Sequence, residues 1–169
     1  MVNINLMKQE AFRNGYRGRY ADAKVCQDII LKAIANSNLN RNVTIKGGVV
    51  MRGITNNSRR ATLDIDMDFI KYSLSDDSID AFIRSLNNLQ GITITRIGDI
   101  KELKLRDYHG KRVDVKIEDQ FSNSLISKID LGVHTKLDIE QEEYCFDIEI
   151  DEDGASLLIN SEEQIFTEK

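Results

Sequence analysis

The chain has 169 residues, with 23 Lys and Arg against 28 Asp and Glu, and its net charge of −5 argues against a dedicated basic nucleic-acid coat protein. Hydrophobic residues make up 41% and charged residues 30%, which is typical of one soluble domain with a real core. No apolar run approaches the roughly 20 residues of a transmembrane helix, and the N-terminus lacks a signal-peptide pattern. By elimination, we expect a cytoplasmic protein with no membrane partner.

The cysteines and histidines give no sign of a disulfide framework or a metal site. Cys26 and Cys145 lie far apart in the sequence, which predicts structural thiols in a reducing compartment. The two histidines are isolated from each other and from other metal-ligating patterns.

The first half of the chain alternates between helical and strand patterns. Apolar residues at a spacing of three to four predict a helix over residues 21–35. A short apolar run at 43–45 predicts a strand, the pair Gly47-Gly48 follows it, and a short helix begins after that pair. Another helix is expected from a cap at Ser75 to about residue 89.

The second half of the chain is mostly strands. Short segments rich in β-branched residues predict strands near 92–97, 100–105, 112–117, 125–131 and 144–150, with a hairpin turn at 108–111. The order of elements predicts an α+β (or α/β) domain, a mixed β-sheet with helices packed mainly on one face.

Residues 63–69 (LDIDMDF) alternate without a break and predict a strand with one apolar and one acidic face. Asp64, Asp66 and Asp68 would share the acidic face at roughly 7 Å spacing, where their charges repel unless solvent or a cation compensates. Carboxylate pairs of this kind suit Mg²⁺, which completes its shell with water and substrate phosphates. A solvated edge face is the alternative interpretation.

Lys46-Gly47-Gly48 lies between the predicted strand and the next helix. Glycines let the backbone approach a ligand closely, and free amides at a helix start attract phosphate, although a simple tight turn explains the pair alone. Lys46 and Arg60 are placed to meet triphosphate oxygens, or else are solvated. Together with the acidic strand, the glycine pair predicts a phosphoryl-transfer site.

Two segments resemble the AbiEii/AbiGii-type toxin nucleotidyltransferases of the DNA polymerase β-like superfamily. Residues 45–51 (IKGGVVM) are similar to the family's "KGGTAL" segment, and residues 60–69 (RATLDIDMDF) to its "R-x-T-x-D-I-D-L-D-F" segment. The spacing between the two segments also fits. Residues 128–130 (KID) resemble a third segment, "K-I-D", on a later strand.

The resemblance implies a set of metal-binding and catalytic residues. Asp64 and Asp66 would hold two Mg²⁺ ions, and Asp130 would bind one of them and help deprotonate the attacking hydroxyl. Asp114, on another predicted strand, remains an alternative to Asp130. Asp68 is interpreted as supporting the ligands or facing solvent. Lys46, Gly47, Gly48 and Arg60 would bind the nucleotide.

The implied activity is transfer of a nucleoside monophosphate from an NTP to a hydroxyl of a tRNA or a protein. The implied role is the toxin of a bacterial toxin–antitoxin or phage-defence system, with an antitoxin protein as partner. The alternative is a non-catalytic module of the same fold that binds nucleotide or a partner protein. A metal-dependent phosphohydrolase is less favoured, because neither histidine belongs to a water-activating cluster.

Two departures from the family pattern stand out. Val49 replaces the threonine that often follows the glycine pair. Residues 161–169 (SEEQIFTEK) resemble the start of a helical region, with Ser161 as a helix cap, that usually continues further. We therefore expect a nucleotidyltransferase catalytic domain over residues 1–160 and the start of a truncated helical C-terminal region over 161–169.

Overall fold

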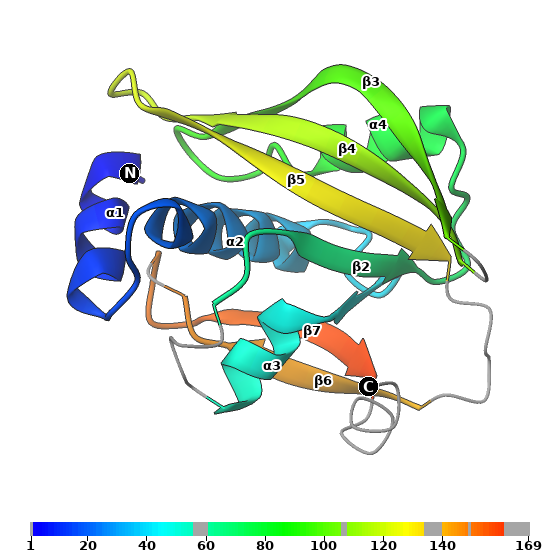
Figure 1. Cartoon of the computed structure of the whole chain (residues 1–169), viewed down its shortest axis with the longest axis horizontal. Coiled ribbons are helices and arrows are strands. Elements are labelled where there is room, and N and C mark those ends of the chain that lie inside the picture. Colours follow the sequence, from blue (N-terminus) through cyan, green and yellow to red (C-terminus); the bar gives the residue numbers. More distant parts are fainter. Residues whose placement is uncertain (1, 56–60, 106–107, 134–139, 149, 161–169) are drawn as a thin grey trace.

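A computed structural model describes residues 2–55, 61–105, 108–133, 140–148 and 150–160. Within them lie four helices and seven strands (Figure 1). The helices are α1 (Ile4–Arg13), α2 (Arg19–Asn36), α3 (Gly48–Thr55) and α4 (Asp76–Ser85). The strands are β1 (Val43–Lys46), β2 (Ile65–Phe69), β3 (Thr93–Leu105), β4 (Tyr108–Glu118), β5 (Ser124–Val133), β6 (Gln141–Phe146) and β7 (Ala155–Asn160).

The strands form one mixed sheet in the order β3-β4-β5-β2-β1-β7-β6. Figure 1 shows β3, β4 and β5 as the upper part of the sheet and β7 and β6 as the lower part, with β2 between them. Strand β2 is antiparallel to β1 and parallel to β5. The expected α+β class and mixed sheet are therefore confirmed.

Strand β2 lies in the centre of the core because its apolar residues alternate along it. Ile65, Met67 and Phe69 are all fully buried, and the Phe69 ring meets the Phe82 ring of α4 edge-on at 5.1 Å. Burial of each such side chain contributes about 1.5–3 kcal/mol. This burial holds the strand in one register.

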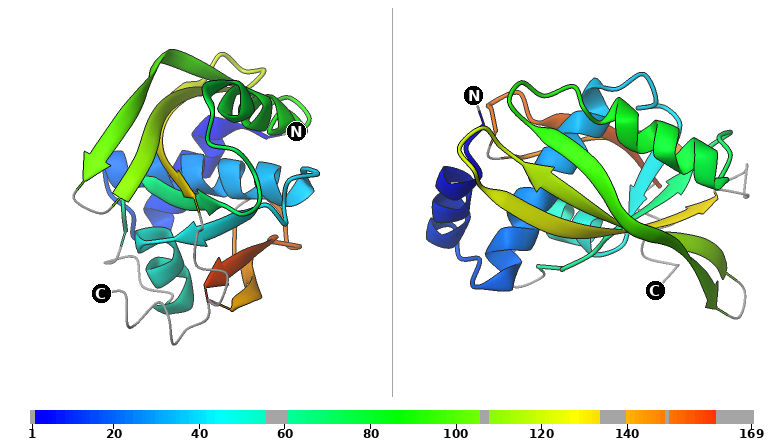
Figure 2. Two further views of the ribbon diagram at one scale, coloured as in Figure 1. Left: turned by 90° about the vertical axis from the view of Figure 1, so that its right-hand side faces the viewer. Right: turned by 90° about the horizontal axis from the view of Figure 1, so that it is seen from above.

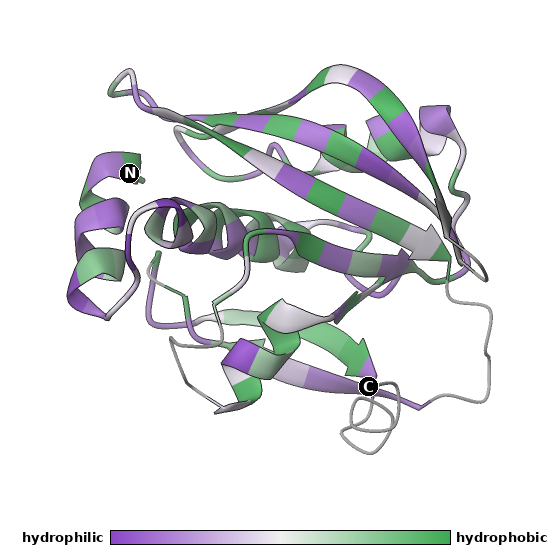
Figure 3. Ribbon diagram, viewed as in Figure 1, coloured by the Kyte–Doolittle hydropathy of each residue, from purple (hydrophilic) through white to green (hydrophobic). Residues whose placement is uncertain are grey.

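The long strands show the same alternation. Val113, Val115 and Ile117 of β4 are buried, whereas Arg112 and Asp114 lie on the opposite face of the sheet. Figure 3 shows this as bands of alternating hydropathy along β4 and β5. The polar face of these strands is the one that carries the candidate site.

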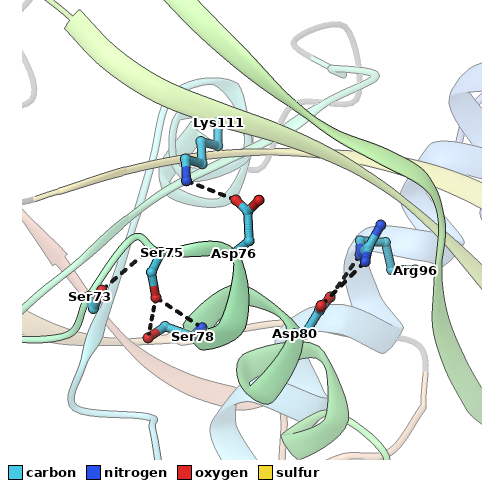
Figure 4. Close-up of polar contacts among 7 residues, drawn as sticks. All are labelled: Ser73, Ser75, Asp76, Ser78, Asp80, Arg96 and Lys111. Atoms are coloured by element: carbon cyan, nitrogen blue, oxygen red, sulfur yellow. Dashed lines mark hydrogen bonds and ion pairs between the residues drawn. The ribbon is translucent and has the colours of Figure 1, made fainter.

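Helix α4 is attached to β3 and β4 by charged contacts (Figure 4). The Ser75 hydroxyl caps the helix by accepting from the Ser78 amide at 3.2 Å, as its position in the sequence predicts. Lys111 Nζ lies 2.9 Å from Asp76 Oδ1, and Arg96 Nε lies 2.7 Å from Asp80 Oδ1. Arg96 is opposite Val115 and Lys111 is opposite Leu131, so these contacts lie on the other face of the sheet from Arg112 and Asp130.

Helix α2 packs on β5 and β7, and α1 packs beside its first turns (Figures 1 and 2). Every residue of α2 from Ala23 to Leu31 is buried, so this helix forms much of the core. None of the described helices is long and apolar enough to cross a membrane.

Several sequence-based expectations about boundaries are wrong. Strand β2 begins at Ile65, so Asp64 lies in the bend before it. The segments 92–97 and 100–105 form one strand, β3, with an irregularity between Ile97 and Lys101 that the sequence suggested as a break. Residues 108–111 belong to β4 and are not a turn, and β6 ends at Phe146.

Two elements were not anticipated, α1 and β7. Strand β7 pairs with β1 in parallel and with β6 in antiparallel fashion, so it joins the C-terminal hairpin to the sheet. The helix start expected at residues 161–169 lies outside the described residues, as does Arg60.

Candidate functional site

Four charged residues line up across the sheet, and we call them the cross-strand row. Lys46 of β1 is opposite Asp66 of β2, Asp66 is opposite Asp130 of β5, and Asp130 is opposite Arg112 of β4. Directly opposed residues point to the same face of a sheet. The row therefore places two carboxylates side by side, with one cationic residue at each end.

Arg112 binds the Asp130 carboxylate with two hydrogen bonds. Arg112 Nε donates to Oδ1 at 2.6 Å and Nη2 donates to Oδ2 at 3.0 Å, a bidentate geometry that fixes the orientation of the carboxylate. This hydrogen bonding, with the charge of Asp130, raises the pKa of Arg112 above its ordinary value. The Asp130 carboxylate is therefore held in one orientation.

The surroundings of Asp66 favour the neutral form of its carboxyl group. Burial is the main cause that raises the pKa of Asp66 to about 6, and repulsion from Asp130 is the second. Lys46 opposes the increase, whereas the charge of Asp64 and a side-chain hydrogen bond with Asp130 add to it. Two neighbouring carboxyls that share a proton behave in this way.

Lys46 is also bound to Asp68. Lys46 Nζ lies 3.0 Å from Asp68 Oδ1, and Asp68 is only 9% exposed. Of the two interpretations of Asp68, solvent exposure is therefore wrong, and a supporting contact to Lys46 is what the structure shows. Because Lys46 contacts Asp68, it only partly offsets the charge on Asp66.

The glycine turn packs directly onto these residues. Gly47 has φ +75°, and a Cβ there would lie 2.6 Å from Asp66 Oδ2. A Cβ on Gly48 would lie 2.8 Å from the Thr62 Cβ. Gly48 requires glycine for space, whereas Gly47 requires it for its backbone conformation, and a side chain there would also displace the Asp66 carboxylate.

Helix α3 starts from this turn. The Met51 amide donates to the Gly47 carbonyl at 3.2 Å, which begins the helical hydrogen-bonding pattern. The first amides of a helix have no carbonyl partner within it and carry partial positive charge. Val49 has no polar side-chain atom to offer a ligand, and its side chain is fully buried in the core.

Strand register distinguishes the two candidates for the later carboxylate. Asp130 is adjacent to Asp66, whereas Asp114 lies on β4, one strand further away, opposite Lys128. The structure therefore brings Asp130, and not Asp114, to Asp66. The charge of Asp64, in the bend before β2, contributes to the raised pKa of Asp66 and to that of Arg112.

The described residues do not contain a preformed metal cage. No group of three or more His, Cys, Asp or Glu side chains among them lies close enough together to hold a metal ion. The Asp66–Asp130 pair nevertheless fits Mg²⁺, which needs only one or two carboxylates when water and phosphates complete its shell. Burial, followed by repulsion from Asp130, raises the pKa of Asp66 to about 6, and a bound cation would counteract both effects.

The structure adds Arg112 to the residues that sequence reasoning selected. Nothing in the local sequence of β4 marks Arg112, because its role depends on the pairing of β4 with β5. Lys24 and Arg52 are buried, and Lys32 contacts Asp151 at 3.0 Å.

A mixed α+β sheet that carries a glycine turn beside paired carboxylates has the architecture of a nucleotidyltransferase domain. Residues 29–169 match the family described as "Nucleotidyl transferase AbiEii toxin, Type IV TA system". The chain belongs to this family of toxin nucleotidyltransferases, as the sequence resemblance indicated. Comparison with individually curated proteins gives no match.

Substitution of Gly47 by alanine tests the close approach of the turn to Asp66. Gly98 is the matched control, because it has φ +69° but nothing within 4 Å of an added Cβ. Both variants strain the backbone, and only Gly47→Ala also forces the Asp66 carboxylate away. Urea unfolding should therefore show Gly47→Ala to be less stable than Gly98→Ala by about 1–3 kcal/mol. Equal losses would show that the turn does not press on Asp66.

Substitution of Asp66 by asparagine tests the raised pKa. Between the ordinary value of 3.8 and about 6, folded Asp66 binds a proton that unfolded Asp66 has lost, so its contribution to stability declines as pH rises through this window. We expect Asp66→Asn to be more stable than the wild type at pH 7, by about 1 kcal/mol after allowance for solvent screening. The gain should disappear near pH 4, measured by unfolding without metal.

Asp80→Asn is the control for this measurement, because its hydrogen bond with Arg96 lowers the pKa of Asp80. That contribution to stability is present above the ordinary pKa and is lost as pH falls, so Asp80→Asn should reduce stability at pH 7. Loss of stability at pH 7 in both variants would contradict the account of Asp66.

Proposed function

We propose that the chain is a Mg²⁺-dependent nucleotidyltransferase that transfers a nucleoside monophosphate from an NTP to a hydroxyl group. The observation that carries this proposal is the Asp66–Asp130 pair, with a glycine turn closed onto Asp66. Protein folds rarely keep two adjacent carboxylates half-buried without a cation or a proton between them. Membership in a family of nucleotidyl transferase toxins supports the same activity.

In this proposal, the glycine turn and the start of α3 bind the triphosphate. The backbone amides there present partial positive charge, and Gly47 and Gly48 leave no side chain in the way. Lys46, which also contacts Asp68, contributes positive charge beside the turn. Arg60 is proposed as a further phosphate-binding residue from its sequence position.

Asp64, Asp66 and Asp130 are the proposed metal-binding residues. Two bound Mg²⁺ ions would neutralise charge on the α-phosphate and on the leaving group. Arg112 keeps the Asp130 carboxylate in one orientation through its two hydrogen bonds. In the proposed reaction Asp130 is thus a positioned base.

The proposed reaction balances as an in-line displacement. The acceptor oxygen forms a bond to the α-phosphorus, the bond from that phosphorus to the bridging oxygen breaks, and pyrophosphate leaves. The hydroxyl proton passes to a carboxylate oxygen of Asp130. The acceptor is a tRNA or a protein hydroxyl, and label from an α-³²P-NTP would be retained on RNA or on protein accordingly.

The biological role that we propose is that of the toxin of a bacterial toxin–antitoxin or phage-defence system, with an antitoxin protein as partner. The family description, which names a type IV toxin–antitoxin system, supports this role. An experiment must distinguish this enzyme from the alternative, a non-catalytic module that binds nucleotide or a partner protein.

Calorimetry with ATP, GTP, CTP and UTP, each with and without Mg²⁺, tests the proposal. At least one nucleotide should bind in a Mg²⁺-dependent way, and Asp66→Asn should weaken that binding about 100-fold, because one charged ligand is lost. Asp80→Asn removes a carboxylate of α4 that pairs with Arg96 of β3, and this variant should bind as the wild type does.

Each other outcome has a definite meaning. Absence of binding to all four nucleotides would overturn the proposal. Nucleotide binding that does not depend on Mg²⁺ and is unchanged in Asp66→Asn would favour the non-catalytic module.

A further inference from the structure

Helix α2 buries polar side chains where a packing helix would carry apolar ones. Lys24 is 6% exposed, and Gln27 and Asp28 are fully buried. Burial of such groups costs free energy unless each finds a hydrogen-bond partner. The hydrogen-bond partners of these side chains therefore show which segments α2 holds in place.

Lys24 and Asp28 bind each other. Lys24 Nζ lies 2.5 and 2.6 Å from the two Asp28 carboxylate oxygens, one turn apart on the same helix. This ion pair joins two residues of α2, and Lys24 Nζ also lies 5.8 Å from the centroid of the Tyr16 ring. Gln27, by contrast, has both of its amide contacts outside the helix.

The Gln27 side chain joins three segments of the chain. Its Nε2 donates to the Thr62 carbonyl at 2.8 Å, and its Oε1 accepts a hydrogen bond from Arg52 Nη1. Arg52 belongs to α3 and is only 5% exposed. One buried amide thus ties α2 to α3 and to the segment that leads into Asp64.

Both tethered segments belong to the candidate site. Thr62 packs against Gly48, so closely that an added Cβ on Gly48 would clash with it. Thr62 also lies two residues before Asp64 and four before Asp66. A shift of Thr62 would therefore move the acidic segment relative to the glycine turn.

We propose that Gln27 is a positioning residue, which fixes the glycine turn relative to Asp64 and Asp66 through Thr62 and Arg52. The expected effect on nucleotide binding rests on the proposed function, whereas the hydrogen bonds of Gln27 to Thr62 and Arg52 do not depend on it. Gln27 precedes residues 29–169, so the family match does not include it. Its amide acts on the site from outside the matched segment.

Gln27→Glu separates the two contacts of the amide. A glutamate keeps an acceptor for Arg52 and strengthens that contact with its charge, but it cannot donate to the Thr62 carbonyl. Asn42→Asp is the matched control, because Asn42 Nδ2 donates to the Ile70 carbonyl at 3.0 Å, just past the other end of β2. Both variants replace an amide by a carboxylate and remove one tether of the same strand.

Hydrogen exchange and NMR follow the tether directly. In Gln27→Glu, amide exchange should rise over residues 61–66, and the amide signals of Gly47 and Gly48 should shift. In Asn42→Asp, faster exchange should be confined to the other end of β2, and the glycine signals should stay in place. If residues 61–66 exchange equally in the two variants, the tether is refuted.

Calorimetry with Mg²⁺ and each of ATP, GTP, CTP and UTP measures how the loss of the Gln27 hydrogen bond changes nucleotide affinity. Gln27→Glu should weaken the wild-type binding about tenfold, and Asn42→Asp should leave it unchanged at a similar unfolding midpoint. Unchanged binding in Gln27→Glu, or an equal loss in both variants, would overturn the positioning role. If the wild type binds no nucleotide, the proposed function fails, and the exchange measurement alone decides whether Gln27 holds the turn.

Discussion

The parallel pairing of β2 with β5 sets the carboxylates of Asp66 and Asp130 directly opposite each other. A slip of one residue would turn Asp66 toward the core and Met67 toward the site, because successive side chains alternate between faces. Three fully buried residues of β2, Ile65, Met67 and Phe69, oppose that slip. Burial of these residues thus keeps the Asp66 and Asp130 carboxylates adjacent, although their mutual repulsion is unfavourable.

The surrounding residues reduce this repulsion without removing it. Arg112 is committed to Asp130 by two hydrogen bonds, and Lys46 shares its charge with Asp68. Asp66 is left with a raised pKa and with the glycine turn pressed against it. A partly buried carboxylate held beside a second one in a rigid frame is suited to a cation that arrives with its substrate.

The sequence predicted the elements that depend on local patterns. Alternation predicted the core of β2, three-to-four spacing predicted α2 and α4, and the glycine pair predicted the turn before α3. Helix α1 was missed although Ile4, Met7 and Ala11 carry a weak helical signal. The family resemblance selected Asp130 and left Asp114 as an alternative, and the strand register separates the two. The roles of Arg112 and Gln27 could not be predicted, because they depend on contacts between segments distant in the sequence.

The most direct test is a titration of the Asp66 side-chain carboxyl by ¹³C NMR, with and without Mg²⁺. Without the metal, the account predicts an apparent pKa of about 6 for Asp66, because of burial and the neighbouring Asp130. Saturating Mg²⁺ should lower this pKa, since a bound cation favours the ionised pair. An ordinary carboxyl pKa that Mg²⁺ leaves unchanged would contradict the account.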